Sequence, residues 1–247
     1  MAKQTALQLV NQVLNNLGDV QVTTLAGITG AALFAFNCLN EGIYDIAFEF
    51  PNQLLETNAS FAIVSGTATY TKSAALYLYD KDSFRYNENK SLDYKASKIF
   101  DLEYPVQTDT GVPRVIRDWQ NMFWAYPVPA TSENGFVVKY RAWQLPTPLN
   151  TATDSMTCWM PEGFDLTLLA DWATKKVLHY RHNEEESLYG VKIWGEERGD
   201  GRGDQGNMSR FQNLYMSHQI DDGSMMVEPM EGAGGYPSGL FNANGYQ

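Results

Sequence analysis

The chain has 247 residues, of which 44% are hydrophobic, and this is enough to build one or two packed domains. Its 29 acidic and 18 basic residues give a net charge of −11, which argues against a nucleic acid reader, because binding to phosphates needs clustered lysine and arginine. The start of the chain is polar and amphipathic, and no window approaches the roughly 20 apolar residues of a membrane span, so we expect neither a secretory signal nor a membrane partner.

The first predicted helix begins at Thr5, which forms a capping box with Gln8 three residues later. Apolar residues then recur at helical spacing until Gly18, which ends the helix. They are Leu7, Val10, Leu14 and Leu17.

A second helix is predicted over residues 28–50, where the apolar side chains again keep a helical stripe. Gly42 lies inside it and costs about 1 kcal/mol relative to alanine. We interpret such a glycine as a place where another helix crosses closely. Pro51 ends the helix, because the residue before a proline is pushed out of the α region.

Short alternating runs between residues 60 and 143 predict a β section. The runs are 61–64, 67–71, 75–79 and 98–104, while the polar stretch 81–95 is expected to be an exposed loop. Both faces of residues 75–79 carry large side chains, which suits a small sandwich or a sheet packed on helices.

Two longer strands flank the turn at Asn134-Gly135 and are predicted to pair as a β-hairpin. The outgoing strand has an apolar row and stops at Pro127 and Pro129, which lack the amide hydrogen that a ladder needs. The row consists of Met122, Trp124, Tyr126 and Val128, and it is matched on the return strand by Phe136, Val138, Tyr140 and Ala142.

The helical period returns after Pro161, and a second helix is predicted after a break near Asn183. The predicted apolar stripes are Leu166, Leu169 or Ala170, Ala173, Val177 and Tyr180 in the first helix, and Leu188, Val191 and Trp194 in the second. The whole pattern predicts an α+β fold. An antiparallel helical bundle (residues 1–56 and 157–198) carries an inserted antiparallel β-sheet or sandwich unit (residues 57–156).

Residues 199–247 are predicted to form an extended C-terminal arm. They hold ten of the 20 glycines and five of the nine methionines, so this stretch is not expected to fold alone. Its apolar side chains are too many for a solvating tail, and we expect the arm to order on assembly, a loose terminus being the alternative. The residues expected to contact a partner protein or a neighbouring subunit are Phe211, Tyr215, Met225, Met226, Tyr236 and Phe241.

Three patterns resemble catalytic or binding sites, and each has a simpler interpretation. His179, His182 and Glu186 share a helix face, but histidine is also favoured at the end of a helix by the helix dipole. Residues 201–206 satisfy the dinucleotide pattern G-x-G-x-x-G, yet they follow charged helical residues instead of a buried strand. The Arg-Gly-Asp tripeptide inside this stretch is interpreted as chance.

Asp80 opens a run that begins like a calcium loop, but Phe84 and Arg85 occupy positions that need a ligand and a turn glycine. Pairs of carboxylates, such as Glu103 with Asp109 or Asp165 with Asp171, could in principle hydrolyse glycosides. The sequence does not fix the distance between the two carboxylates on which that reaction depends. Cys38 and Cys158 are too few and too far apart for a disulfide scaffold or a metal knuckle, so we expect reduced thiols. We expect no catalytic residue, no cofactor and no metal.

The order of elements from residue 111 to residue 163 resembles the head-to-tail adaptor (connector) proteins of tailed bacteriophages. In that family an aromatic strand ending in Pro-x-Pro precedes a strand with Tyr-x-x-x-Pro, an acidic loop, and a Leu-Pro or Met-Pro helix start. The matching residues are Trp124 to Pro129, Tyr140 to Pro148, Asp154, and Met160 to Phe164. The likeness extends more weakly over residues 6–194. It departs at Lys72-Ser73, where the family has Leu-Pro.

The resemblance implies a structural, non-enzymatic virion protein that is made in the host cytoplasm and located at the head-tail junction. It implies one subunit of a closed twelvefold ring that docks beneath the portal, links capsid to tail and lines the DNA exit channel. The implied partners are the portal protein, neighbouring adaptor subunits and a downstream tail or nozzle protein. DNA would pass without sequence-specific binding, and an acidic lumen repels phosphates.

Two other classes of function remain open at the level of the sequence. A carbohydrate-binding module with an aromatic β face is the first, because 13% of the residues are aromatic and sugars stack on exposed coplanar rings. It requires Trp124, Tyr126, Phe136 and Tyr140 to be exposed, whereas their alternation predicts burial. An acidic hydrolase is the second.

Overall fold

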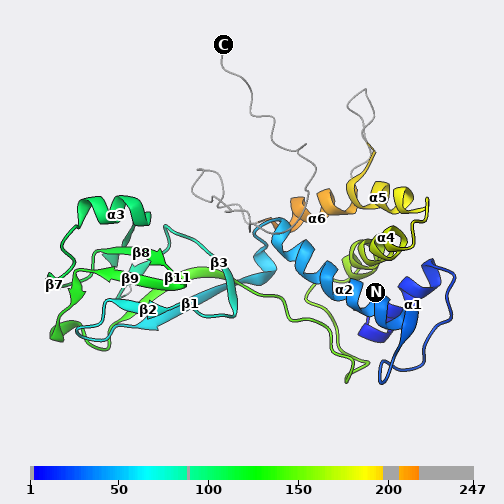
Figure 1. The fold of residues 1–247 in the computed structure, drawn as a ribbon, viewed down its shortest axis with the longest axis horizontal. Helices are drawn as coiled ribbons and strands as arrows, with labels where there is room; N and C mark the ends of the chain where they lie inside the picture. The colour runs from blue at the N-terminus through cyan, green and yellow to red at the C-terminus, as the bar shows by residue number, and fades with distance from the viewer. Residues whose placement is uncertain (1–2, 88–89, 197–205, 217–247) are drawn as a thin grey trace, which may run out of the picture.

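A computed structural model describes residues 3–87, 90–196 and 206–216 of the chain. It shows helices α1, α2, α4, α5 and α6 at one end and the strands with helix α3 at the other (Figure 1). The chain passes from the helices into the β unit after α2 and returns after strand β11. The α+β fold class predicted from the sequence is confirmed.

Helix α1 (Ala6–Asn16) begins where the capping box places it. The Thr5 hydroxyl accepts a hydrogen bond from the Gln8 amide at 3.3 Å, and the Gln8 side chain accepts one from the Thr5 amide at 2.8 Å. Gly18 follows the helix with φ +70°, a conformation that glycine adopts without steric cost. Both predicted ends of this helix are confirmed.

Helix α2 (Gly30–Glu49) packs between α1 and α4 (Ala170–Tyr180). A Cβ at Gly42 would lie 3.1 Å from Cδ1 atoms of both Leu169 and Trp172, so the glycine allows the two helices to approach closely, as predicted. Phe50 is extended, with φ −157°, and the helix ends before Pro51.

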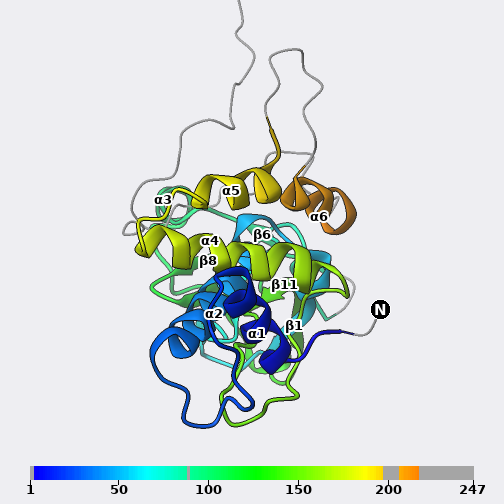
Figure 2. The same cartoon turned by 90° about the vertical axis from the view of Figure 1, so that its right-hand side faces the viewer.

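Helix α4 forms the middle layer of the bundle. Helices α5 and α6 lie on one side of α4, and α1 and α2 lie on the other (Figure 2). A short helical turn, Asp165–Leu169, leads into α4, and α5 spans Glu186–Trp194. In the stripe predicted for α4, Leu169, Ala170, Ala173 and Val177 are buried, Leu166 is half-buried in the turn before α4, and Tyr180 is exposed. The stripe predicted for α5 is wrong, because Ile193 faces the bundle while Leu188, Val191 and Trp194 are exposed.

Helix α6 (Asn207–Tyr215) corrects the prediction that the arm is extended from residue 199. Met208 and Phe211 are fully buried in the same core as α1, α2 and α4, so this part of the segment packs as a helix of the bundle. Gly206 precedes it, and a Cβ there would overlap backbone atoms of Ile193 and Gly195 at the end of α5. The sequence could not show this close approach.

The β unit contains two main sheets that pack face to face, as the sandwich prediction requires. One sheet has the order β1 (Glu56–Ala62), β11 (Val137–Gln144), β4 (Arg85–Tyr86) and β5 (Lys90–Ser91), with β3 (Leu76–Tyr79) also pairing with β11. The other has the order β2 (Thr69–Thr71), β9 (Met122–Tyr126), β8 (Val115–Trp119) and β6 (Asp93–Tyr94), and β7 (Thr110–Gly111) pairs separately with β10 (Val128–Pro129). Rings of Phe84, Phe123 and Tyr140 fill the core between the two main sheets.

The predicted hairpin of β9 and β11 is wrong, because the two strands lie in different sheets. β9 pairs with the preceding strand β8 through a tight turn in which Gln120 and Asn121 have φ of +50° and +62°. Phe123 and Ala125 therefore face the core instead of Met122 and Trp124. The inward row of β11 is confirmed at its last three predicted positions, while Phe136 is exposed.

Two other predictions in the β section are wrong. Residues 98–104 were expected to be a strand, but helix α3 (Ser97–Glu103) occupies this place and packs Phe100 on the outer face of β8 and β9. The stretch 81–95 is no exposed loop, since it contains β4, β5 and β6 and buries Phe84, Tyr86 and Leu92. In both segments the burial comes from long-range contacts, which the local sequence does not show.

The helices meet the β unit at a small apolar junction around Trp143, which is fully buried with Ala47 and Leu55. The Tyr77 hydroxyl donates a hydrogen bond to the Ala47 carbonyl oxygen at 3.0 Å, and its ring packs edge-on against Phe48. The two parts of the molecule thus share a packed contact as well as two chain crossings.

Candidate assembly surfaces

The charge of the chain is divided unequally between its two parts. Residues 57–156 carry ten acidic and ten basic side chains, so the net charge of −11 belongs to the remaining residues. The helical part is therefore acidic and the β unit is neutral. The net charge of the whole chain does not show this difference between its two parts.

The Asp118 carboxylate fastens the two sheets of the sandwich together. It accepts hydrogen bonds from Tyr79 on one sheet and from Tyr94 (2.5 Å) and Lys72 (2.9 Å) on the other. Burial raises the pKa of Asp118, but the hydrogen bonds from these three groups outweigh it and lower the pKa to about 2. Burial and the bond to Asp118 raise the pKa of Tyr79. At neutral pH the Asp118 carboxylate is therefore ionised and accepts all three hydrogen bonds, which is typical of a structural role.

Helix α3 is held on the sheet by Arg117. The guanidinium lies between the rings of Phe100 and Trp124, at 4.4 and 4.5 Å from their centroids, and pairs with Asp101 on α3. The inner side of α3 is thereby fixed by one aromatic side chain and one ion pair, which leaves its outer side to solvent.

The outer side of α3 is apolar and exposed. Leu102 is 75% exposed and Ile99, at i−3 on the same helix, is also exposed; Val106, three residues after the end of the helix, is exposed as well. Trp119 lies beside the start of α3, is 49% exposed, and adds to it. We call Ile99, Leu102, Val106 and Trp119 the α3 face. Sequence reasoning missed it because the segment was predicted as a strand, although the helical spacing was visible.

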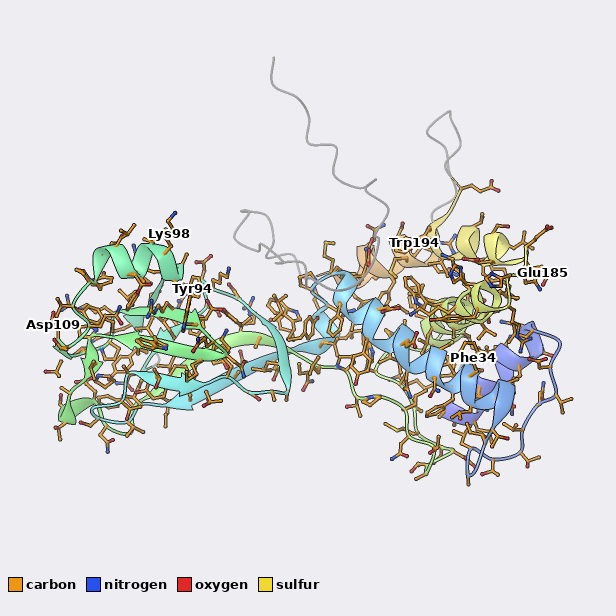
Figure 3. The ribbon with its side chains drawn as sticks, in the orientation of Figure 1. Phe34, Tyr94, Lys98, Asp109, Glu185 and Trp194 are labelled. Atoms are coloured by element: carbon orange, nitrogen blue, oxygen red, sulfur yellow. The ribbon has the colours of Figure 1, made fainter. Side chains whose placement is uncertain are left out.

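The charges around the α3 face are mostly paired. Asp101 pairs with Arg117, and Glu103 pairs with Lys95. Lys98 lies on the outer side of α3 (Figure 3), and no ion pair of Lys98 occurs within the described residues. Among the charged side chains of α3 itself, the one without an ion pair in the described residues is therefore positive.

Helix α5 presents a second exposed apolar surface. Leu188 is 61% exposed, Val191 and Trp194 are also exposed, and we call these three residues the α5 face. Glu184 and Glu185 lie at the start of the helix and are exposed, and Glu185 and Trp194 mark its two ends in Figure 3. The acidic side chains therefore lie at the Leu188 end of the α5 face, while Lys192 is exposed near its other end.

The residues expected to contact a portal or neighbour fall into three groups. Phe211 is fully buried against Phe50, Phe164 and Trp159, so it stabilises the bundle and is not on the surface. Tyr215 is half-buried and packs on Phe164 and Phe211. Met225, Met226, Tyr236 and Phe241 lie outside the described residues.

The candidate catalytic patterns occupy structural positions. His179 and Glu186 interact at 3.1 Å across the turn between α4 and α5, where His182 has φ +51°. Asp165 is 1% exposed and accepts hydrogen bonds from the amides of Gln4, Gly163 and Leu166. It ties the start of the chain to the turn before α4.

The remaining carboxylates and thiols are also accounted for by local contacts. Asp80 accepts a hydrogen bond from the Asp82 amide in a turn, and Asp109 accepts one from the Tyr126 hydroxyl at 2.8 Å. Cys38 and Cys158 are free and buried, and burial raises the pKa of each thiol to about 11. Across the described ranges, no three potential metal ligands gather at one place. In the same ranges no helix is long and apolar enough to cross a bilayer.

Comparison with known proteins identifies a family for the chain. The family model described as SU10 adaptor protein matches residues 4–217, which is most of the chain and includes α6. A search of curated proteins finds no match. The family match confirms the resemblance to phage head-to-tail adaptors, and it supports a phage adaptor role and a place in the virion. The chain, with its helical bundle, inserted β sandwich and two exposed apolar faces, belongs to the SU10 adaptor protein family.

Proposed function

We propose that the protein is a structural, non-enzymatic subunit of a closed ring that docks beneath the portal, links capsid to tail and lines the DNA exit channel. The family match over residues 4–217 carries this proposal, because an adaptor role implies contacts with portal and tail components. The resemblance to head-to-tail adaptors gives the ring twelve copies. The downstream partner is a tail or nozzle protein.

The uneven charge supports a channel in which DNA does not stick. Residues 1–56 and 157–216 carry a net charge of −7, so a ring with its helical parts toward the axis surrounds DNA with like charge. Phosphates are then repelled by the wall, and no sequence-specific contact is made. The neutral β unit has no such effect and suits contacts between proteins.

The exposed apolar faces of α3 and α5 support a role in assembly. Large exposed apolar patches on a soluble protein mark sites of interaction, and both faces are formed by helices whose inner sides are already packed. Tyr236 and Phe241 stand in the uncharged last part of the chain, residues 232–247, and we assign them to the portal contact. Phe211 takes no part in it, because it is buried.

The aromatic residues of the β unit give no support to a carbohydrate-binding function. Stacking platforms for sugars need several coplanar exposed rings, but Tyr126 and Tyr140 are buried, at 8% and 5% exposure. Trp124 is covered by Arg117 on one side. The aromatic rows serve the core of the sandwich.

The test is the native mass of the protein, measured alone and after mixing with the portal of its source phage. A large complex of fixed stoichiometry with the portal is expected. A species of 27.8 kDa in both conditions, with no portal binding, contradicts the ring and the docking.

A further inference from the structure

The α3 face and the α5 face differ in the charge that surrounds them. Lys98 adds positive charge to the α3 face, while the two acidic side chains that flank the α3 face are paired with Lys95 and Arg117. The α5 face stands next to Glu184 and Glu185. An acidic apolar partner is therefore attracted to the first face and repelled by the second.

The chain itself contains a stretch with the complementary character. The 31 residues after Met216 include four acidic residues and no lysine or arginine. All four acidic residues fall within residues 221–231, and residues 232–247 carry none. The apolar residues of this acidic stretch are Ile220, Met225, Met226, Val227 and Met230. Methionine side chains are unbranched and adapt to irregular apolar surfaces.

We propose that residues 220–231 of one copy dock on the α3 face of a second copy. The methionines cover Leu102 and its apolar neighbours, and the acidic residues lie near Lys98. This contact rests on the proposed function, since it needs copies side by side in a ring. Each subunit then gives one acidic segment and receives one, so the contact is head-to-tail and can close a ring.

The position of Met216 limits how far the acidic segment can extend. Met216 is held at the junction of the two parts, where its carbonyl oxygen accepts a hydrogen bond from Gln53 at 3.0 Å. Helix α3 lies at the far end of the β unit (Figure 1), beyond β1, whose seven residues span roughly 23 Å. Residue 220 can lie at most about 14 Å from Met216. Residue 220 therefore lies short of the α3 face of its own copy, whereas Met226, ten residues after Met216, can lie up to about 36 Å away. The assignment to a second copy follows from the side-by-side subunits of the proposed ring.

Disulfide trapping between full-length variants tests the contact. L102C and M226C proteins are mixed, assembled and oxidised mildly, and a covalent dimer joining the two variants is expected. The matched control replaces L102C with L188C, since Leu188 is 61% exposed on another apolar helix face and lies close in sequence to Glu184 and Glu185. We expect at least a tenfold lower yield with L188C. Cys38 and Cys158 are buried, so neither competes.

Three results would overturn the contact. They are an equal yield with L188C, a bond that forms only within one chain of an L102C/M226C double variant, and a yield that K98E leaves unchanged. K98E should lower the yield several-fold, whereas K192E on α5 should not. The native mass of the same mixture separates the two proposals. A ring that forms without the bond contradicts the contact alone, and the absence of any oligomer contradicts the ring as well.

Discussion

The helical part and the β unit of this molecule are stabilised in different ways. The bundle has a mainly aliphatic core, and its helices approach closely at Gly42 and Gly206. The β unit has a core of packed aromatic rings, and its two sheets are joined by the half-buried carboxylate of Asp118. Stability in the first part depends on how closely backbones pack, and in the second on ring contacts and one polar cluster.

Replacing Phe84 with alanine should cause the largest loss of stability, and it tests the role of aromatic contacts in the β unit. Phe84 is fully buried and its ring contacts Tyr79, Phe123 and Tyr140. We expect the free energy of unfolding to fall by about 3–5 kcal/mol, measured by urea denaturation. A loss below about 1 kcal/mol would contradict the view that aromatic contacts dominate the β unit.

Gly42→Ala tests the importance of close packing in the bundle. The added methyl group meets Leu169 and Trp172 at 3.1 Å, and we expect a loss of about 1–3 kcal/mol. Gly190→Ala in α5 is the matched control, because the nearest atom, Lys175 Cε, lies at 3.9 Å. The control should gain up to about 1 kcal/mol from helix propensity. Equal effects of the two changes would refute the close crossing.

The Asp118 cluster should make the stability of the β unit depend on pH in acid. The pKa of Asp118 is lowered to about 2, so its contribution is complete above the unfolded pKa of about 4 and is lost as the pH falls through about 2. After allowance for partial exposure we expect about 1–2 kcal/mol. Asp118→Asn should remove this part of the pH dependence in denaturation curves between about pH 4 and pH 2. An unchanged curve would contradict the conclusion that the Asp118 carboxylate joins the two sheets.

Thr5→Ala should have the smallest effect on stability, and it tests whether the capping box determines the start of α1. Loss of the capping hydrogen bond is expected to cost about 1 kcal/mol in thermal or urea unfolding. Thr29→Ala is the control, since Thr29 stands at the same position before α2 but its side chain makes no capping hydrogen bond. If both variants lose the same stability, the capping box does not explain the start of α1.

The difference between the helical bundle and the β unit also explains what could be predicted from the sequence. In the bundle, Thr5, Gly18, Gly42 and Pro51 act through local geometry or helical period, and their roles were predicted correctly. In the β unit, alternation identified β9 and β11 as strands but could not assign their partners, because pairing joins residues far apart in the chain. The fold class was therefore accessible and the sheet topology was not.

The candidate surfaces were predicted less well than the fold. The α3 face depends on a helix that Arg117 and Phe100 hold against the sheet, and neither contact can be read from residues 98–104 alone. The apolar side of α5 was recognised, but its direction was wrong, because it faces outward. Phe211 was correctly singled out as too apolar for a solvating tail, yet its partners are in its own bundle.

The contact of Gly206 with the end of α5 has a practical consequence. Gly206 lies against Ile193 and Gly195, so the two described segments that flank residues 197–205 are held close together by packing. The entropy cost of a connection between two such segments rises only slowly with length, by about 0.6 kcal/mol for each doubling. A fluorescent tag or a displayed peptide inserted there should leave α6 in place, and each subunit of an assembled particle would then carry one label at a defined position.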